Sequence, residues 1–385
     1  MLRVPTTQRK LCQSAPLLRG SVFAWPSWVI PRITPRGRSS NPCARQRMTE
    51  PRFLVVRLGS LGDIVHTFPA VAGLRESFPK AEIVWLTHPR WKELVGSSEL
   101  VTEIWELETR SLASVHQIIR RIPKKKFTAS IDYQGLWKSA VFPFLGRVPR
   151  RIGFSSHSVR EFGVPALYTD RVFVATAHIA DQNGELSHGA GAQRGVAPFL
   201  LSVSSLQEAF VLQLLRGFNA ERYIVLSPGG GWRSKCWPPD RYGALCRQIH
   251  AKLGLRCFLN QGPGDEGIVA AVKAASGDAA PVACSSSLHQ LMVLLRNALC
   301  VVGGDTGPLH LAVALGTPVV ALFGPTDPAR NGPYRLRGDS TKDIVLRSPN
   351  AVTTYKRGDQ PDPSLLELHV ATVFDAVRCQ VEARR

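Results

Sequence analysis

The chain lacks the glycine patterns that mark two large classes of nucleotide enzymes. It contains no Walker A pattern, and no GxGxxG follows its first predicted strand. These absences argue against phosphoryl transfer and dinucleotide redox chemistry. Paired carboxylates with metal-ligand spacing are also missing, and no Asp-x-Asp follows a strand, so a bound divalent metal is not expected.

Paired cysteines and long apolar runs are missing as well. The eight cysteines are scattered at positions 12, 43, 236, 246, 257, 284, 300 and 379, and none forms a CxxC pair. This scattered distribution of cysteines favours buried free thiols in a reducing compartment over a disulfide framework or a zinc site. No run of 18 apolar residues occurs, so no membrane span is expected.

Acidic residues are absent from the first 47 positions, which contain nine Lys or Arg. Without this segment the net charge falls from +19 to about +10, because 39 basic and 29 acidic residues remain. The remaining excess fits anionic small molecules or an anionic membrane surface. No aromatic-interleaved basic stripe suggests nucleic acid. The segment 1–47 has three interpretations, namely a targeting segment, a disordered tail or a misassigned start ahead of Met48.

From residue 51 onward, strands and helices alternate at the spacing of parallel α/β units. We predict strands at 52–58, 81–87, 101–107, 127–131 and 151–154, and again at 222–226, 255–260, 299–302 and 318–323. We predict helices at 64–78, 111–121, 136–145, 204–216, 240–253, 264–275 and 288–296. The glycine-rich stretch 178–203 is predicted to be a loop that approaches a domain boundary. Two such units facing each other would form a cleft at the C-terminal edges of their sheets.

These patterns divide the chain into four segments. Residues 1–50 form the basic extension, 51–203 an N-terminal domain and 204–363 a C-terminal domain. Residues 364–385 form a final helix, which we expect to pack back on the N-terminal domain.

The most informative segment runs from Val301 to Pro325 and predicts a strand, a tight turn, a helix and a second strand. Gly303 and Gly304 end the first apolar run, and Asp305 or Thr306 can cap the helix that follows. A helix N-terminus offers unpaired N–H groups and a partial positive charge. The segment therefore predicts a site for a phosphorylated ligand.

Two further glycine turns are predicted to face the same cleft. Gly59–Asp63 follows the first strand, and Asp63 is either a helix cap or a general base aimed across the cleft. The triple glycine at 229–231 precedes Arg233 and Lys235, which add positive charge where a diphosphate would lie. In the turn at 261–266, one of the acids Asp265 and Glu266 could bind ribose hydroxyls, or either could cap a helix.

Three segments resemble a known family. Leu58–Val71 and Gly303–Ala312 are similar to the two signatures of the ADP-heptose:lipopolysaccharide heptosyltransferases, and Asp132–Ala140 resembles a segment typical of heptosyltransferase I. The resemblance covers about residues 52–380. It implies a GT-B fold, that is, two Rossmann-like domains with parallel sheets facing each other across a cleft. It also implies inverting, metal-independent transfer of heptose from ADP-heptose to Kdo of the inner core, with no cofactor.

The resemblance also implies roles for individual residues. Asp63 would be the base that deprotonates the acceptor hydroxyl, and Lys235 would contact the donor phosphate. Asp305, Thr306, Gly307 and His310 would match the donor-binding signature of the family, whereas Gly230, Arg233 and Glu266 are predicted donor contacts from the chemistry of their own turns. Lys138, Arg160 and Glu161 fall in the first domain, where the family binds the anionic lipid acceptor, and Ser60 is predicted to join them in acceptor binding. The residues before Lys235, Gly-Gly-Gly-Trp-Arg-Ser, differ from the hydroxyl and acidic residues of the type I family pattern.

The expected partners are ADP-heptose and Kdo-lipid A, with no nucleic acid. A lipid acceptor and a basic chain together suggest a cytoplasmic protein in peripheral contact with the inner membrane leaflet. The alternatives are heptosyltransferase II or another family member with a different acceptor, a GT-B-like nucleotide-sugar epimerase, and a non-catalytic binder of lipid A or nucleic acid.

Overall fold

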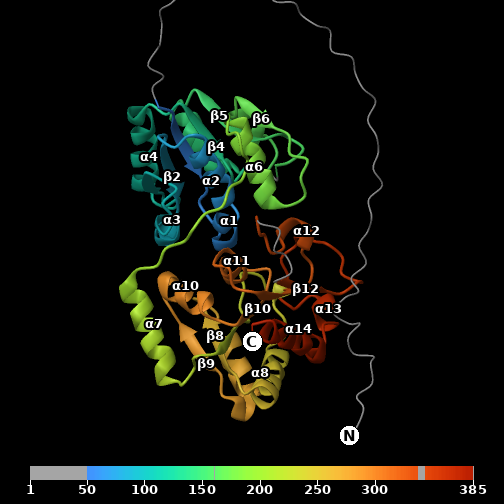
Figure 1. The fold of residues 1–385 in the computed structure, drawn as a ribbon. Coiled ribbons are helices and arrows are strands. Elements are labelled where there is room, and N and C mark those ends of the chain that lie inside the picture. The colour runs from blue at the N-terminus through green and yellow to red at the C-terminus, as the bar shows by residue number, and fades with distance from the viewer. Residues whose placement is uncertain (1–49, 160, 337–342, 385) are drawn as a thin grey trace, which may run out of the picture. The chain divides into compact units, whose positions relative to one another are not determined.

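The first half of the folded chain is built around a six-stranded parallel sheet. A computed structural model describes residues 50–159, 161–336 and 343–384 (Figure 1). The strands of this sheet are β1 (Arg52–Val56), β2 (Glu82–Thr87), β3 (Glu103–Glu106), β4 (Ala129–Asp132), β5 (Arg150–Phe154) and β6 (Asp170–Val172). They lie in the order β3-β2-β1-β4-β5-β6, and every neighbouring pair is parallel.

The second half repeats this plan. Its strands are β7 (Tyr223–Ser227), β8 (Arg256–Gln261), β9 (Val282–Ser285), β10 (Cys300–Gly304), β11 (Val319–Phe323) and β12 (Asp343–Arg347). Their order is β12-β11-β10-β7-β8-β9, again fully parallel. Numbered within each half, both sheets have the order 3-2-1-4-5-6 of doubly wound dinucleotide-binding folds. The predicted α/β class with two parallel sheets is confirmed.

Helices cover both faces of each sheet, as parallel sheets require. Those of the first half are α1 (Leu61–Val65), α2 (Phe68–Ser77), α3 (Lys92–Gly96), α4 (Leu112–Lys125), α5 (Trp137–Leu145) and α6 (Ile179–Gly189). Those that follow are α7 (Ser205–Gly217), α8 (Pro239–Leu253), α9 (Glu266–Ser276), α10 (Leu288–Arg296), α11 (Gly307–Ala314), α12 (Pro328–Asn331), α13 (Pro363–Leu366) and α14 (Val370–Glu382).

The core follows the alternation of side chains along the strands. In β1, Phe53 and Val55 pack toward α2, whereas Leu54 and Val56 pack toward α4 and α5. The cluster on the α2 side continues without interruption into the second half, where it includes Val301 of β10. One apolar core therefore spans both sheets.

The order of strands fixes where a ligand site can form. In each sheet the direction of the connections reverses between the first and fourth strands, that is, between β1 and β4 and between β7 and β10. Ligands of open α/β sheets bind outside the carboxyl ends of the strands at this switch point. The predicted glycine turns after β1, β7 and β10 all lie there.

Some predicted elements differ from the structure. The helix predicted at 64–78 is divided into α1 and α2, and Pro69 lies in the first turn of α2. The stretch predicted to be a loop contains α6 instead. A β-carbon on Gly184 of α6 would lie 2.8 Å from the Val196 side chain, so this glycine permits close packing rather than breaking the helix.

The position of the last helix was also predicted incorrectly. The sequence suggested that it returns to the N-terminal domain. Instead, α14 packs against α8, β10 and β11 of the second half, with Val373, Phe374 and Val377 buried in the cluster on that face of the second sheet. Apolar residues on α14 pack here because α8 and α9 leave part of this face uncovered at β10 and β11. The domain boundary at 203/204 stays a prediction.

Among the described residues, no helix combines the length and apolar character needed to span a membrane.

Candidate active site

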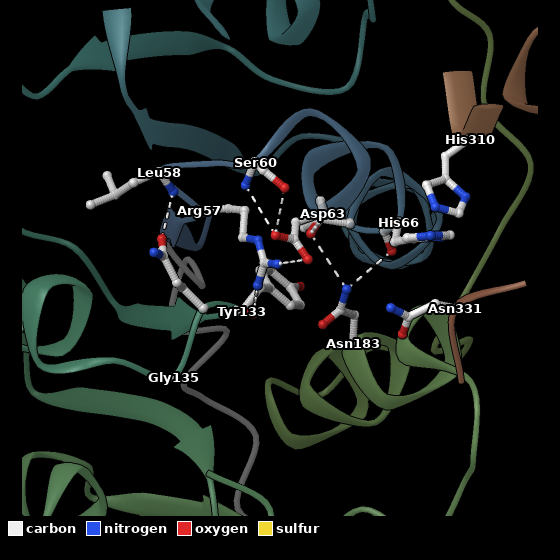
Figure 2. Close-up of polar contacts among 12 residues, drawn as sticks. Arg57, Leu58, Ser60, Asp63, His66, Tyr133, Gly135, Asn183, His310 and Asn331 are labelled. Carbon is white, nitrogen blue, oxygen red and sulfur yellow. Dashed lines mark hydrogen bonds and ion pairs between the residues drawn. The ribbon is translucent and has the colours of Figure 1, made fainter. Parts of the chain in front are cut away.

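The turn after β1 holds Asp63 through three contacts (Figure 2). Ser60 donates to Asp63 Oδ2 from its backbone N, at 3.0 Å, and from its hydroxyl, at 2.9 Å. Arg57 Nη2 lies 2.6 Å from Asp63 Oδ1. The Asp63 side chain is 43% exposed, whereas that of Arg57 is 7% exposed. The structure thus presents a fixed, accessible carboxylate, and it also shows the helix-cap geometry that is the second interpretation of this residue.

Arg57 ties this carboxylate to the neighbouring strand end. Its Nη1 donates to the Tyr133 carbonyl, directly after β4, and its own carbonyl accepts a 3.1 Å bond from Trp85 Nε1. The sequence analysis did not single out Arg57. A detectable signal was present, because Arg57 is the one charged residue in the apolar run from Phe53 to Leu58, directly before the glycine turn.

Asp132 organises the segment that follows β4. This buried carboxylate accepts hydrogen bonds from the Tyr168 hydroxyl at 2.7 Å, from Ser139 Oγ at 2.9 Å and from the Gln134 backbone at 2.9 Å. Burial raises the pKa of Asp132, and these hydrogen bonds oppose the increase. Gln134 in turn accepts a 2.8 Å bond from the Leu58 backbone N. The Asp132–Ala140 motif is therefore bonded to the turn that carries Asp63.

In the second half, Asp305 connects Lys235 to His310. Lys235 Nζ lies 2.7 Å from Asp305 Oδ2, and His310 Nε2 lies 2.9 Å from Asp305 Oδ1. Burial alone would raise the pKa of Asp305, but the hydrogen bond from His310 and the positive charge of Lys235 outweigh it and hold the pKa below the ordinary value. Asn331 of α12, which the sequence analysis missed, adds a 3.4 Å bond to Oδ2.

The helix cap predicted at this turn is not formed by a side chain. Thr306 occupies the N-cap position of α11, but its side chain makes no capping hydrogen bond. The Thr306 hydroxyl is buried and has no hydrogen-bond partner among the described residues. Since the Asp305 carboxylate bonds Lys235 and His310, the first turn of α11 is not capped by either predicted side chain.

The two halves meet where α1 contacts α11. A β-carbon on Gly62 would lie 2.8 Å from His310 Cδ2, and a β-carbon on Gly307 would lie 2.6 Å from the Leu61 side chain. Both positions therefore require glycine for this approach. The contact brings the turn that carries Asp63 and the turn that carries Asp305 to adjacent positions.

Three histidines line this contact. The His66 ring centroid lies 4.4 Å from that of His310 and 5.3 Å from that of His178, which stacks on Tyr334 at 4.6 Å. Burial lowers the pKa of His66 well below its ordinary value, and the nearby His310 and His178 lower it further. Burial also lowers the pKa of His178. The neutral form is therefore favoured for His66 and His178. His66 and His310 also border a pocket of about 260 Å³ whose other lining residues are mainly apolar.

The triple-glycine turn lies against two other parts of the predicted site. A β-carbon on Gly230 would lie 2.9 Å from Thr306 Cγ2, and one on Gly229 would overlap the Asp265 carboxylate. Asp265 rather than Glu266 is thus the acid next to the glycines. Glu266 is exposed and accepts a 3.3 Å bond from the Gly264 backbone N. Arg233 is exposed on the short helix that ends at Lys235.

The predicted acceptor residues are less closely grouped. Ser60 bonds Asp63 directly. Lys138 is exposed on α5, and Glu161 accepts a 2.7 Å bond from the Trp137 backbone N at the start of this helix. Arg160 lies outside the described residues. Lys138 and Glu161 therefore share one region of the first half, and the bonds of Gln134 and Tyr133 connect their segment with the Asp63 turn.

The arrangement provides an accessible carboxylate on one side of the contact between α1 and α11. On the other side it provides a lysine, a helix N-terminus and glycine-lined backbone. Such groups can accept a proton and stabilise a departing anion, respectively. Within the described ranges, no three His, Cys, Asp or Glu side chains form a group that could hold a metal ion.

Comparisons with known proteins give a family for this arrangement. Residues 115–355 match the family described as glycosyltransferase family 9 (heptosyltransferase). Lipopolysaccharide heptosyltransferase 1 from Pseudomonas aeruginosa is 28% identical over 295 residues, which are 74% of this chain and 81% of the relative. Lipopolysaccharide heptosyltransferase 3 from Escherichia coli is 21% identical over 277 residues, which are 69% of this chain and 81% of the relative.

Solved structures agree on the fold. ADP-heptose lps heptosyltransferase II from E. coli has a TM-score of 0.71 at 20% identity and covers 86% of this chain and 99% of its own. The E. coli heptosyltransferase WaaC, solved with ADP-2-deoxy-2-fluoro heptose, has a TM-score of 0.64 at 24% identity and covers 85% of this chain and 99% of its own. The predicted GT-B architecture is confirmed.

Proposed function

Because the chain belongs to glycosyltransferase family 9, the lipopolysaccharide heptosyltransferases, we propose that it is heptosyltransferase I. In this reaction it moves L-glycero-D-manno-heptose from ADP-heptose to Kdo of the inner core, with inversion at the anomeric carbon. The donor is supported by WaaC, which was solved with a fluorinated ADP-heptose. The type I assignment is supported by the heptosyltransferase 1 from P. aeruginosa and by the Asp132–Ala140 segment.

The observation that carries this proposal is the contact between α1 and α11. His310 lies against Gly62, the residue before Asp63, and it also bonds the Asp305 that holds Lys235. A candidate base and a candidate leaving-group site therefore come from different sheets and lie on either side of one contact. Single displacement needs this separation, because the acceptor attacks the anomeric carbon opposite the departing diphosphate.

Asp63 is the proposed general base. Its carboxylate forms an ion pair with Arg57, and Ser60 fixes its orientation. Exposure of 43% leaves it accessible to a hydroxyl of the acceptor. As the bond from the acceptor oxygen to the anomeric carbon forms, the proton of that hydroxyl passes to Asp63. The bond between the anomeric carbon and the diphosphate breaks, and the electron pair leaves with ADP.

Lys235 and the start of α11 are proposed to stabilise the departing diphosphate. An ammonium has three donors, so Lys235 can bond Asp305 and still donate to a phosphate oxygen. Thr306 and Gly307 open α11, whose N-terminal amides favour negative charge. Asp305 and His310 keep Lys235 in place. Charge grows on the diphosphate as the reaction proceeds, so these contacts strengthen toward the transition state.

The remaining donor contacts are proposed from where their residues lie relative to α11 and the triple-glycine turn. Gly230 lies against Thr306 and leaves room for a phosphate to approach the backbone. Arg233 adds a cation beside this turn. Asp265 and Glu266 are the two candidate ribose ligands, and the position of Asp265 against Gly229 supports Asp265. Ser60, Lys138, Arg160 and Glu161 form the proposed acceptor set.

One experiment separates the members of the family. The full chain is incubated with ADP-heptose and either Kdo-lipid A or its once-heptosylated product, and mass spectrometry shows which acceptor gains a heptose. Heptosyltransferase I transfers to the first acceptor only. Transfer to the second alone would identify heptosyltransferase II chemistry and refute the type I assignment.

Two controls distinguish a transferase from an epimerase and from a binding protein. A nucleotide-sugar epimerase would change ADP-heptose without any acceptor, so the donor is also incubated alone. A binding protein would retain its acceptor without turnover, and its affinity would be insensitive to substitution of Asp63.

A further inference from the structure

Helix α5 turns an apolar face outward. Trp137, Phe144 and Leu145 are spaced i, i+7 and i+8, so they lie on one side of the helix. Trp137 is 47% exposed, Phe144 44% and Leu145 48%. The core contacts of α5 come from Ala140, Val141 and Phe142. The outward residues are therefore not needed to cover the sheet.

Phe162 extends this face from a neighbouring loop. Its side chain is fully exposed. Its carbonyl accepts a 3.1 Å bond from Trp137 Nε1, and a β-carbon on Gly163 would lie 3.1 Å from the Trp137 ring. The loop is thus seated against the N-terminal end of the helix. We use the name α5 face for Trp137, Phe144, Leu145 and Phe162. Exposed apolar patches of this kind mark interaction sites.

Positive charge surrounds the α5 face. Lys138 projects from the same helix, and Arg147 is exposed just after its end. The Arg151 guanidinium lies 5.6 Å from the centroid of the Phe144 ring. The Glu161 carboxylate also borders this face and accepts a hydrogen bond from the Trp137 backbone N. Cations thus flank the aromatic and apolar side chains at both ends of the helix.

We propose that the α5 face is a docking surface for an anionic lipid bilayer. Tryptophan and phenylalanine partition into the interfacial region of a membrane, and flanking Lys and Arg are attracted to anionic headgroups. A protein partner would not by itself require cations at both ends of the helix, whereas an anionic membrane would attract them. The inference rests on the proposed function in one respect, since a lipid acceptor must be reached at a membrane surface and the proposed acceptor residues Lys138 and Glu161 border this face.

Helix α7 provides a matched control surface in the linker before the second sheet. Leu206, Phe210 and Leu214 are also exposed and spaced i, i+4 and i+8. Near this stripe, Arg296 forms an ion pair with Glu208. Substitution of these three residues therefore removes a similar amount of exposed apolar surface away from the α5 face.

The test is co-sedimentation of the full chain with vesicles that contain neither ADP-heptose nor Kdo-lipid A. One set of vesicles is pure phosphatidylcholine, and the other also contains anionic phosphatidylglycerol. We expect binding to the anionic vesicles that weakens with salt. The triple variant Phe144→Ser/Leu145→Ser/Phe162→Ser should bind at least about tenfold more weakly, and Arg147→Glu at least about fivefold more weakly. The matched variant Leu206→Ser/Phe210→Ser/Leu214→Ser should bind within about twofold of the wild type.

A second measurement separates docking from folding. The triple variant should keep its thermal melting profile and its turnover on a delipidated Kdo saccharide, but lose turnover on acceptor embedded in vesicles. Equal binding to neutral and anionic vesicles would overturn the proposal, and so would equal loss in the α7 variant. Loss of a dimer in sedimentation velocity without loss of vesicle binding would show instead that the α5 face joins two copies of the chain.

These outcomes are independent of the proposed reaction. A chain that binds anionic vesicles through the α5 face but transfers no heptose refutes only the proposed function. A chain that transfers heptose but does not bind the vesicles refutes only the docking surface.

Discussion

His310 of α11 packs against Gly62 of α1 so closely that a β-carbon on Gly62 would lie 2.8 Å from His310 Cδ2. The imidazole has little freedom to move away, because its Nε2 bonds Asp305 at 2.9 Å and its ring faces His66 at 4.4 Å. A single methyl group at position 62 would therefore strain the contact between the two halves.

Gly62→Ala tests this contact. We expect a loss of about 1–3 kcal/mol in the free energy of unfolding, since added volume in a packed contact is not relieved. We also expect lower kcat, because the Asp63 turn shifts relative to α11. Urea unfolding and steady-state kinetics measure the two effects. Gly267→Ala is the control, because a β-carbon there meets nothing within 4 Å and helical alanine is favoured. Equal stability of Gly62→Ala and wild type would contradict the packing argument.

Asp63→Ala should abolish most turnover and largely retain ADP-heptose binding. General bases contribute about 10²–10⁴-fold to rate, so kcat should fall by at least about 100-fold. The measurement combines product formation with calorimetric affinity for the donor. Asp375→Asn, an exposed carboxylate in an i, i+3 ion pair on α14, serves as the control. Turnover of Asp63→Ala within about tenfold of wild type would exclude the base assignment.

Lys235→Ala should weaken ADP binding by about tenfold or more, because a charge-assisted hydrogen bond to the diphosphate is lost. Isothermal calorimetry with ADP measures this loss directly. Lys273→Ala on the exposed side of α9 removes the same charge away from the site and should leave the affinity unchanged. Unchanged affinity in Lys235→Ala would argue against its phosphate role.

His66 predicts a pH dependence of stability. Burial holds its pKa well below the ordinary value, with His310, His178 and Arg57 lowering it further and Asp305 opposing them. Below about pH 6.5 the unfolded chain takes up a proton that the folded chain does not. The free energy of unfolding therefore falls as pH decreases from about 6.5 toward the folded pKa, and it does not change through this group at higher pH.

The free energy of unfolding is measured in urea at pH 7.5 and pH 5.5, about one unit above and one unit below the ordinary histidine pKa. His66→Gln should show a smaller loss between the two values than the wild type. His116→Gln changes an exposed histidine and should keep the full loss. The His66→Gln variant should still lose some stability between the two pH values, because burial also lowers the pKa of His178. An identical loss in His66→Gln and wild type would contradict the prediction.

Sequence patterns were most informative where local chemistry decides the structure. The segment 301–325 folds as predicted into β10, α11 and β11, because glycines end the strand and Pro308 suits the first turn of a helix. The short strands β6, β9 and β12 were missed. They have three to five residues and few fully buried side chains, so their apolar pattern is weak.

Relationships between distant residues were harder to predict. The pair of Arg57 and Asp63 depends on how the chain turns after β1, and the bond from Asn331 to Asp305 depends on the placement of α12. The glycines of α6 resembled loop residues, although Gly184 is needed for close packing. Lys235, Asp305 and His310 were each selected from sequence, but only the fold shows that one carboxylate joins the other two.

Because α14 packs on β10 and β11 beside α8, the second sheet is completed by a helix that follows all six of its strands in the sequence. During synthesis, β1 to β6 and α6 emerge with residues 52–189 and can form their sheet early. Val302 of β10 and Val320 of β11 keep part of their apolar surface uncovered until Val370–Glu382 have left the ribosome. The second half should therefore complete its folding later than the first, and in the interval it is the part of the nascent chain more exposed to chaperones and to aggregation.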